Sequence, residues 1–266
     1  MDVVLGIDTR DLDDRFISTG RYAATVAEMI DATGASPDAI RSSMRRLASK
    51  RRAFSPARGL YVFVPSEYRS WGVVPAEWFI DSMMAHLGRT YYVGLLSAAE
   101  LHGAAHQRPQ VTQVVVDQAL PGRDIERVRL RFCATNADLG SLPVQRRNTK
   151  TGTLAVSSPE LTVVDLCGRP VAGGGLDNVA TIIRELSDEG LISTSGFAQL
   201  VARVPSHALR RAAHLVESLT ELRLDVVAEA AGNGGEPVPL DPHGARRGTV
   251  DRRWNIRVNV QVEPEA

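Results

Sequence analysis

Seven basic residues lie between positions 41 and 58, and no acidic residue interrupts them: Arg41, Arg45, Arg46, Lys50, Arg51, Arg52 and Arg58. Lysine and arginine side chains neutralise phosphates and supply most of the sequence-independent affinity of a protein for nucleic acid. Arginine and serine side chains on an exposed helix face can also read the edges of bases. This spacing therefore indicates contacts to a nucleic acid, although the whole chain of 266 residues has 31 basic and 31 acidic residues.

Two predicted helices would position these side chains. The first runs to about residue 32 and ends at Gly34, the residue type that favours a helix C-terminus. The second begins at Ser36, a good N-cap, with Pro37 in the first helical position. Its apolar residues recur at helical spacing and share one face: Ile40, Met44 and Leu47. The opposite face is then basic and exposed to solvent.

A hairpin is expected directly after the second helix. A short strand around Ala53 and Phe54 precedes a turn through residues 55–59 that contains Pro56 and Gly59, and a strand of β-forming residues follows at 60–64. Helix, tight turn, helix and hairpin is the order of a winged helix-turn-helix. In that motif the second helix enters the major groove of DNA. The hairpin, or wing, would bring Arg58 beside the DNA backbone.

Helical phase assigns roles to the candidate DNA-binding residues. Arg45 and Arg46 are the first choice for base or deep-groove contacts, and Ser42 and Ser43 are the second. Arg41 lies at the edge of the face and could contact either base or backbone. The remaining residues are expected to contact phosphates: Lys50, Arg51, Arg52 and Arg58.

The fold class predicted for the whole chain is α+β, with a winged helix-turn-helix domain at 1–74 and a larger mixed α/β domain at 75–266. Helices are expected at 75–87, 159–167, 176–188, 195–204 and 206 to about 231. A last strand is expected at 254–262, where apolar and polar residues alternate. Since these helices and strands do not alternate regularly, a doubly wound α/β domain is not expected.

Other residue groups could carry chemistry but match no complete motif. His102 and His106 are four residues apart, but Gly103 interrupts the helix that would place them on one face, so we expect no metal site. Nuclease chemistry would need converging carboxylates, and Glu229, Asp241 and Asp251 have no recognised spacing. We therefore predict a protein that is not an enzyme and has no cofactor.

The alternating Arg127, Arg129 and Arg131 are read as a solvated sheet face, with a second nucleic-acid surface as the alternative.

The sequence also indicates a cytoplasmic protein. No charge-free run is long enough to span a membrane. The acidic N-terminus does not resemble a secretory signal, and the two cysteines, Cys133 and Cys167, are expected to be reduced thiols.

Four segments together resemble one family. They are Gly59 to Val62 at the end of the wing, the run from Tyr91 to Gly103 with His106 and Gln107 after it, the segment from Val156 to Leu166, and Trp254 to Asn259. The resemblance is to the AbiE-type (AbiEi) abortive-infection antitoxins of bacteria and covers most of the chain.

This resemblance implies an antitoxin of a type IV toxin–antitoxin pair. Its winged helix would bind repeats in its own promoter, as double-stranded DNA, and repress transcription of the operon. The second domain would counteract a toxin of the nucleotidyltransferase type without a stable complex. Two alternatives stay open: a metal-dependent enzyme that processes nucleic acids and is targeted by a winged helix, and a ligand-sensing transcriptional regulator with an apolar pocket.

Overall fold

The computed structural model describes residues 11–104, 110–231 and 234–264. The chain forms two compact units, each assembled from separate segments. The first unit contains residues 1–90, 120–132 and 146–154, and the second contains residues 91–119, 133–145 and 155–266. The predicted α+β class is confirmed, with helices and strands in both units.

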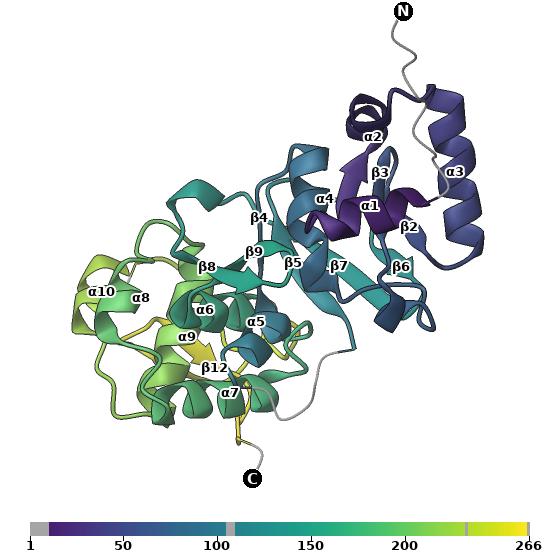
Figure 1. Ribbon diagram of the computed structural model, residues 1–266. Helices are drawn as coiled ribbons and strands as arrows, with labels where there is room; N and C mark the ends of the chain where they lie inside the picture. Colours follow the sequence, from purple (N-terminus) through teal and green to yellow (C-terminus); the bar gives the residue numbers. More distant parts are fainter. Residues whose placement is uncertain (1–10, 105–109, 232–233, 265–266) are drawn as a thin grey trace, which may run out of the picture. The chain divides into compact units, whose positions relative to one another are not determined.

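The N-terminal part of the first unit has the predicted order of two helices and a hairpin. Its elements are α1 (Leu12–Ser18), β1 (Ala23–Thr25), α2 (Val26–Thr33), α3 (Pro37–Ser49), β2 (Ala53–Ala57) and β3 (Leu60–Phe63). The strands form an antiparallel sheet in the order β1-β3-β2. Figure 1 shows α2 and α3 beside β3, the arrangement of a winged helix-turn-helix.

Local signals define where α2 and α3 begin and end. A reciprocal capping box joins Thr25 and Glu28 at the start of α2, and Gly34 ends that helix in the left-handed conformation at φ 68°. The Ser36 side chain accepts a hydrogen bond from the Ala39 N–H at the start of α3. The predicted end of the first helix at Gly34 and the predicted start of the second at Ser36 are confirmed.

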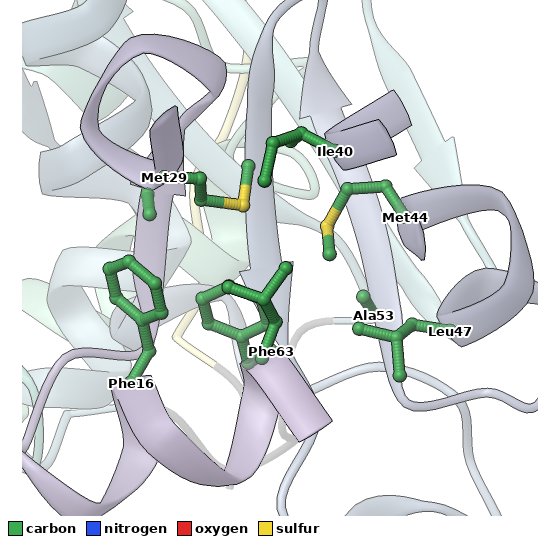
Figure 2. Packing of buried hydrophobic residues seen from close by; sticks show 9 residues of the cluster. Phe16, Met29, Ile40, Met44, Leu47, Ala53 and Phe63 are labelled. Carbon is green, nitrogen blue, oxygen red and sulfur yellow. The ribbon is translucent and has the colours of Figure 1, made fainter. Parts of the chain in front are cut away.

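The core beneath α2 and α3 is apolar and closed. Met29, Ile40, Met44 and Leu47 from these helices are almost completely buried. They gather around Phe63 of β3 in Figure 2, where the rings of Phe16 and Phe63 stack at 5.2 Å between centroids. Burying each such side chain stabilises the fold by about 1.5–3 kcal/mol. This core fixes which face of α3 is turned to solvent.

The first unit continues past residue 74. It includes the 3-10 helices η2 (Ser66–Tyr68) and η3 (Ala76–Trp78), helix α4 (Ile80–Leu87), strand β6 (Arg123–Ile125), and parts of strands β7 (Val128–Ala134), β8 (Val144–Thr149) and β9 (Gly152–Ser157). Phe79 packs edge-on against Phe54 of β2, and Trp78 packs against Tyr22. These aromatic contacts hold residues on both sides of position 74 in one unit.

The second unit is built around α6 (Pro159–Gly168), in which every residue from 159 to 167 is buried. Helices α5 (Leu95–Leu101), α7 (Leu176–Asp188), α8 (Thr194–Ala198) and α9 (Ser206–Leu219) pack against it. Strand β4 (Tyr91–Val93) pairs antiparallel with β5 (Thr112–Val116) and parallel with β9, where Val93 lies opposite Val156. The 3-10 helix η4 (Leu139–Ser141) and helix α10 (Asp225–Ala231) complete the set with the short strands β10 (Val238–Pro239), β11 (Thr249–Asp251) and β12 (Ile256–Val258).

Three predicted elements of this unit are wrong in extent. The helix predicted at 195–204 is only α8, Thr194–Ala198, after which the chain continues in turns. The helix predicted from 206 to about 231 is two helices, α9 and α10, because Thr220 is extended and the Leu224 N–H bonds to the Glu217 carboxylate instead of continuing the helix. The strand predicted at 254–262 is only β12. Its neighbours β10 and β11 are too short to pair with more residues, and Asn255 has a left-handed backbone.

Two further observations concern the remaining expectations. Cys133 and Cys167 are both free thiols, as predicted. Among the described residues, no helix has the length and apolar character needed to cross a bilayer.

Candidate nucleic-acid interface

Helix α3 presents a continuous polar face opposite its buried apolar side. Ser42 and Arg45 lie on this face and are exposed, and Arg41 at its edge is exposed as well. Arg41 donates to Asp38 at 2.9 Å, an ion pair of two exposed side chains. Such a pair contributes little to stability and is easily exchanged for a phosphate contact. Arg46 is half-buried. The helix therefore offers one exposed row of groups that can donate hydrogen bonds to DNA.

Ser43, predicted as a second-choice base contact, does not lie on this face. It is 4% exposed and belongs to the buried side of α3 with Met44 and Leu47. The physical reason is helical phase, since a residue one position after Ser42 is turned by about 100° toward the core. We therefore leave Ser43 out of the interface.

Arg52, predicted as a phosphate contact, forms an ion pair with a carboxylate inside the protein. Its Nε and Nη2 donate to the two oxygens of Asp13 at 2.5 and 2.7 Å, and Nη2 also donates to Asp14 at 2.9 Å. Asp13 is completely buried, and its hydrogen bond to Arg52 raises the pKa of the guanidinium. The pair joins α1 to the residue that directly precedes β2. Arg52 is thus a structural residue.

The other residues at the end of α3 remain exposed. Lys50 ends the helix, and Arg51 follows with a left-handed backbone at φ 56°. One Arg51 guanidinium nitrogen donates to the Ser70 carbonyl at 3.1 Å. This bond orients Arg51 while leaving the side chain exposed to solvent, so Lys50 and Arg51 both keep their place in the candidate interface.

The wing ends in a two-residue turn, Arg58-Gly59, between the paired residues Ala57 and Leu60. Gly59 has φ 87°, which residues with a side chain rarely adopt, and its carbonyl accepts the Val26 N–H. The His86 ring of α4 bonds to the Arg58 carbonyl at 2.9 Å. Two hydrogen bonds to the carbonyl groups of the turn therefore fix its backbone. The exposed Arg58 side chain extends from this fixed turn.

Replacing Arg58 by alanine is expected to weaken binding to operator and random DNA equally, because a guanidinium beside a phosphate releases a counterion but reads no base. The slope of log affinity against log salt should fall by about one unit. Gel-shift titrations at several salt concentrations measure both quantities. A loss of sequence discrimination with an unchanged slope would contradict this role.

The alternating arginines of β7 are partly neutralised within their own hairpin. Arg131 donates to Asp124 at 2.7 Å, and Arg127 at the hairpin turn lies over the Trp71 ring at 5.5 Å. Arg129 lies directly opposite Asp124. Their local partners agree with a solvated sheet face, so we do not include these arginines in the candidate interface.

Of the histidine pair considered as a metal site, only His102 lies in the described part of the chain. His102 bonds through Nε2 to the Ser157 carbonyl at 2.8 Å, and His106 lies outside the described residues. Among the residues that are described, no three or more histidine, cysteine, aspartate or glutamate side chains come together as metal ligands would.

Three of the four segments that resemble AbiE-type antitoxins lie in the second unit: the run from Tyr91 to Gly103, the segment from Val156 to Leu166, and Trp254 to Asn259. Tyr92, from the first of them, donates its hydroxyl hydrogen to Asp165 Oδ2 at 2.8 Å, and Ser157 bonds to Thr162 at 2.7 Å. Both Tyr92 and Asp165 are buried. The C-terminal segment is joined to α9, where Glu217 accepts hydrogen bonds from Arg253 and from the Trp254 indole N–H. The first two of these segments are therefore joined to each other by a buried hydrogen bond, and the third is joined to α9.

Comparison with protein families gives the decisive match. The AbiEi antitoxin C-terminal domain matches residues 92–226, which is half of the chain. The chain belongs to the AbiEi antitoxin family. AbiEi proteins are antitoxins of abortive-infection toxin–antitoxin systems, so a toxin is the expected functional counterpart.

A solved structure shares the fold of this AbiEi antitoxin. It is the crystal structure of the RV2827C protein from Mycobacterium tuberculosis, with a TM-score of 0.62 and 16% sequence identity. The match covers 92% of this chain and 89% of that protein. At this identity the likeness shows the fold alone. Comparison with curated proteins gives no match.

Sequence reasoning missed two residues that support the interface of this AbiEi antitoxin. Asp13 lies 39 positions before Arg52, and His86 lies 28 positions after Arg58. The acidic run around Asp13 was visible, but nothing in the local pattern indicates which basic residue it would meet.

Proposed function

We propose that this antitoxin is a DNA-binding repressor of its own operon, with α3 as the recognition helix and the β2–β3 hairpin as the wing. The exposed basic face of α3 is the observation that carries the proposal. Arg45 and Arg46 are assigned to bases, Ser42 and Arg41 to base or backbone, and Lys50, Arg51 and Arg58 to phosphates. This arrangement fits B-DNA, whose major groove admits one α-helix.

We further propose that the toxin is a nucleotidyltransferase and that the antitoxin counteracts it without an enzymatic reaction or a stable complex. Support comes from membership of the AbiEi family, whose matched segment at 92–226 begins after the recognition helix and the wing. We assign repression to residues 1–74 and neutralisation to residues 75–266. The two activities should then be separable by substitution.

Separation can be tested with the full chain carrying Arg45→Ala and Arg46→Ala, supplied from an independent promoter. We expect a reporter under the native promoter to be derepressed, while cells that express the cognate toxin are still rescued. Both replaced side chains belong to α3, so the matched segment is unchanged. Circular dichroism and hydrogen exchange must first show that the variant is folded. Failure of a folded variant to rescue would contradict separate activities.

A further inference from the structure

The second unit contains a cavity of about 670 Å³ that the antitoxin proposal does not use. Its walls come from β4, the segment at 134–142, α6, the loop at 202–205 and the first turn of α9. Every lining residue lies within the matched AbiEi segment. This volume is within the range of about 300–1,000 Å³ that is typical of small-molecule sites.

One side of the cavity carries a buried polar group. Asp165 accepts the Tyr92 hydroxyl at 2.8 Å and lies 3.4 Å from an Arg169 nitrogen, and Arg169 also donates to the Ala134 carbonyl at 3.0 Å. Burial raises the pKa of Asp165 to about 6. Burying a carboxylate costs free energy, and the partners recover it only in part. Titratable groups that line a cavity and have shifted pKa values are typical of binding sites.

The exposed side of the cavity is basic. Arg203 and His207 are exposed, and Arg203 is oriented by a hydrogen bond to the Ser141 carbonyl at 2.9 Å. Burial and the charges of Arg211 and Arg169 lower the pKa of His207, so its neutral ring offers an anion a hydrogen-bond donor and not a positive charge. Asp138, the other acid of the lining, accepts a hydrogen bond from the Gly140 N–H within its own turn. The first turn of α9 has no acidic residue, so the positive end of its dipole adds to the basic character.

Apolar side chains complete the lining of the cavity. Leu142, Leu161, Val164 and Ala208 contribute to the lining and are buried. A ligand that matches these features carries an anionic group at one end, an apolar body, and hydrogen-bond donors for a carboxylate at the other end.

We propose that this cavity binds a nucleoside 5′-monophosphate, with the phosphate at Arg203 and His207 and the base directed toward Asp165. Guanidinium groups match the geometry of phosphate oxygens, and carboxylates accept hydrogen bonds from the amino groups of bases. The faces of the base would lie against the apolar wall. This site is independent of α3 and of the proposed binding to DNA.

Isothermal titration calorimetry of the full chain with AMP, GMP, CMP and UMP tests the proposal. We expect at least one of them to bind, and its parent nucleoside and inorganic phosphate to bind at least about tenfold more weakly, because each lacks one of the two polar ends. The absence of binding by all four monophosphates at millimolar concentration would overturn the proposal. Equal binding of nucleotide and nucleoside would overturn the assigned phosphate site.

Variants locate the site. Arg203→Gln with His207→Gln should weaken nucleotide binding by about tenfold or more, since both side chains are exposed and their loss leaves the core intact. Asp165→Asn, which keeps an oxygen for the Tyr92 hydroxyl, should change the order of preference among the bases. Arg184→Gln on the exposed face of α7 removes a charge away from the cavity and should have no effect. Unchanged affinity in the Arg203 and His207 variant would overturn the proposal even if Asp165→Asn fails to fold.

Discussion

Replacing Arg52 by alanine is expected to destabilise the first unit by about 3–5 kcal/mol, because the completely buried Asp13 would lose its main partner. The cost arises from leaving a carboxylate charge without compensation inside the protein. Arg69 at 3.8 Å from Asp13 is too distant to replace two short hydrogen bonds. Hydrogen exchange of the α3 amides measures the effect within this unit.

A matched control is available on α3. Arg41→Ala also removes the arginine of an ion pair with an aspartate, but both Arg41 and Asp38 are exposed. Its effect should stay below about 1 kcal/mol. Similar losses of protection in the Arg41 and Arg52 variants would show that burial of Asp13 does not determine the cost.

Replacing Arg45 and Arg46 together by alanine is expected to lower the affinity for the operator by about thirtyfold or more. Each arginine that reads a base contributes about 1–3 kcal/mol, and the two losses combine. Affinity for random DNA should fall much less, because the phosphate contacts proposed for Lys50, Arg51 and Arg58 would remain. Gel-shift titrations of the full chain with DNA from upstream of its own operon, at one fixed salt concentration, measure the difference.

The control for this prediction removes two positive charges from another part of the chain. Arg184→Ala with Arg252→Ala changes two exposed arginines of the second unit. This variant should bind the operator like the unchanged protein. If it loses as much affinity as the Arg45 and Arg46 variant, net charge and not the recognition helix controls binding.

The sequence predicted the elements of the winged helix because their signals are local. Gly34, Ser36 and Pro37 fix the helix ends within a few residues of themselves, and the burial of Ile40, Met44 and Leu47 follows from their spacing. The same phase argument, applied more strictly, would have excluded Ser43. The exposed row of α3 could thus be predicted almost entirely from sequence.

Features that depend on distant partners could not be predicted in this way. The ion pair of Arg52 depends on Asp13, which is distant in the sequence. The end of α9 depends on the hydrogen bond from the Leu224 N–H to the Glu217 carboxylate. The short β12 reflects the length of its neighbours more than its own alternating pattern. The cavity likewise needs α6 and α9 to pack, and no short motif encodes it.

The discontinuous first unit has a consequence for synthesis of the protein on the ribosome. Helix α3 and the β2–β3 hairpin are translated early, but the last segment of this unit ends at residue 154. At about 5–20 residues per second, the interval between residues 90 and 154 lasts roughly 3–13 s. During that time Trp78 lacks the Lys150 ammonium that lies 4.6 Å from its ring, and the Thr151 hydroxyl is not yet bonded to its carbonyl. The nascent chain therefore cannot complete its first unit until more than half of the protein has been made.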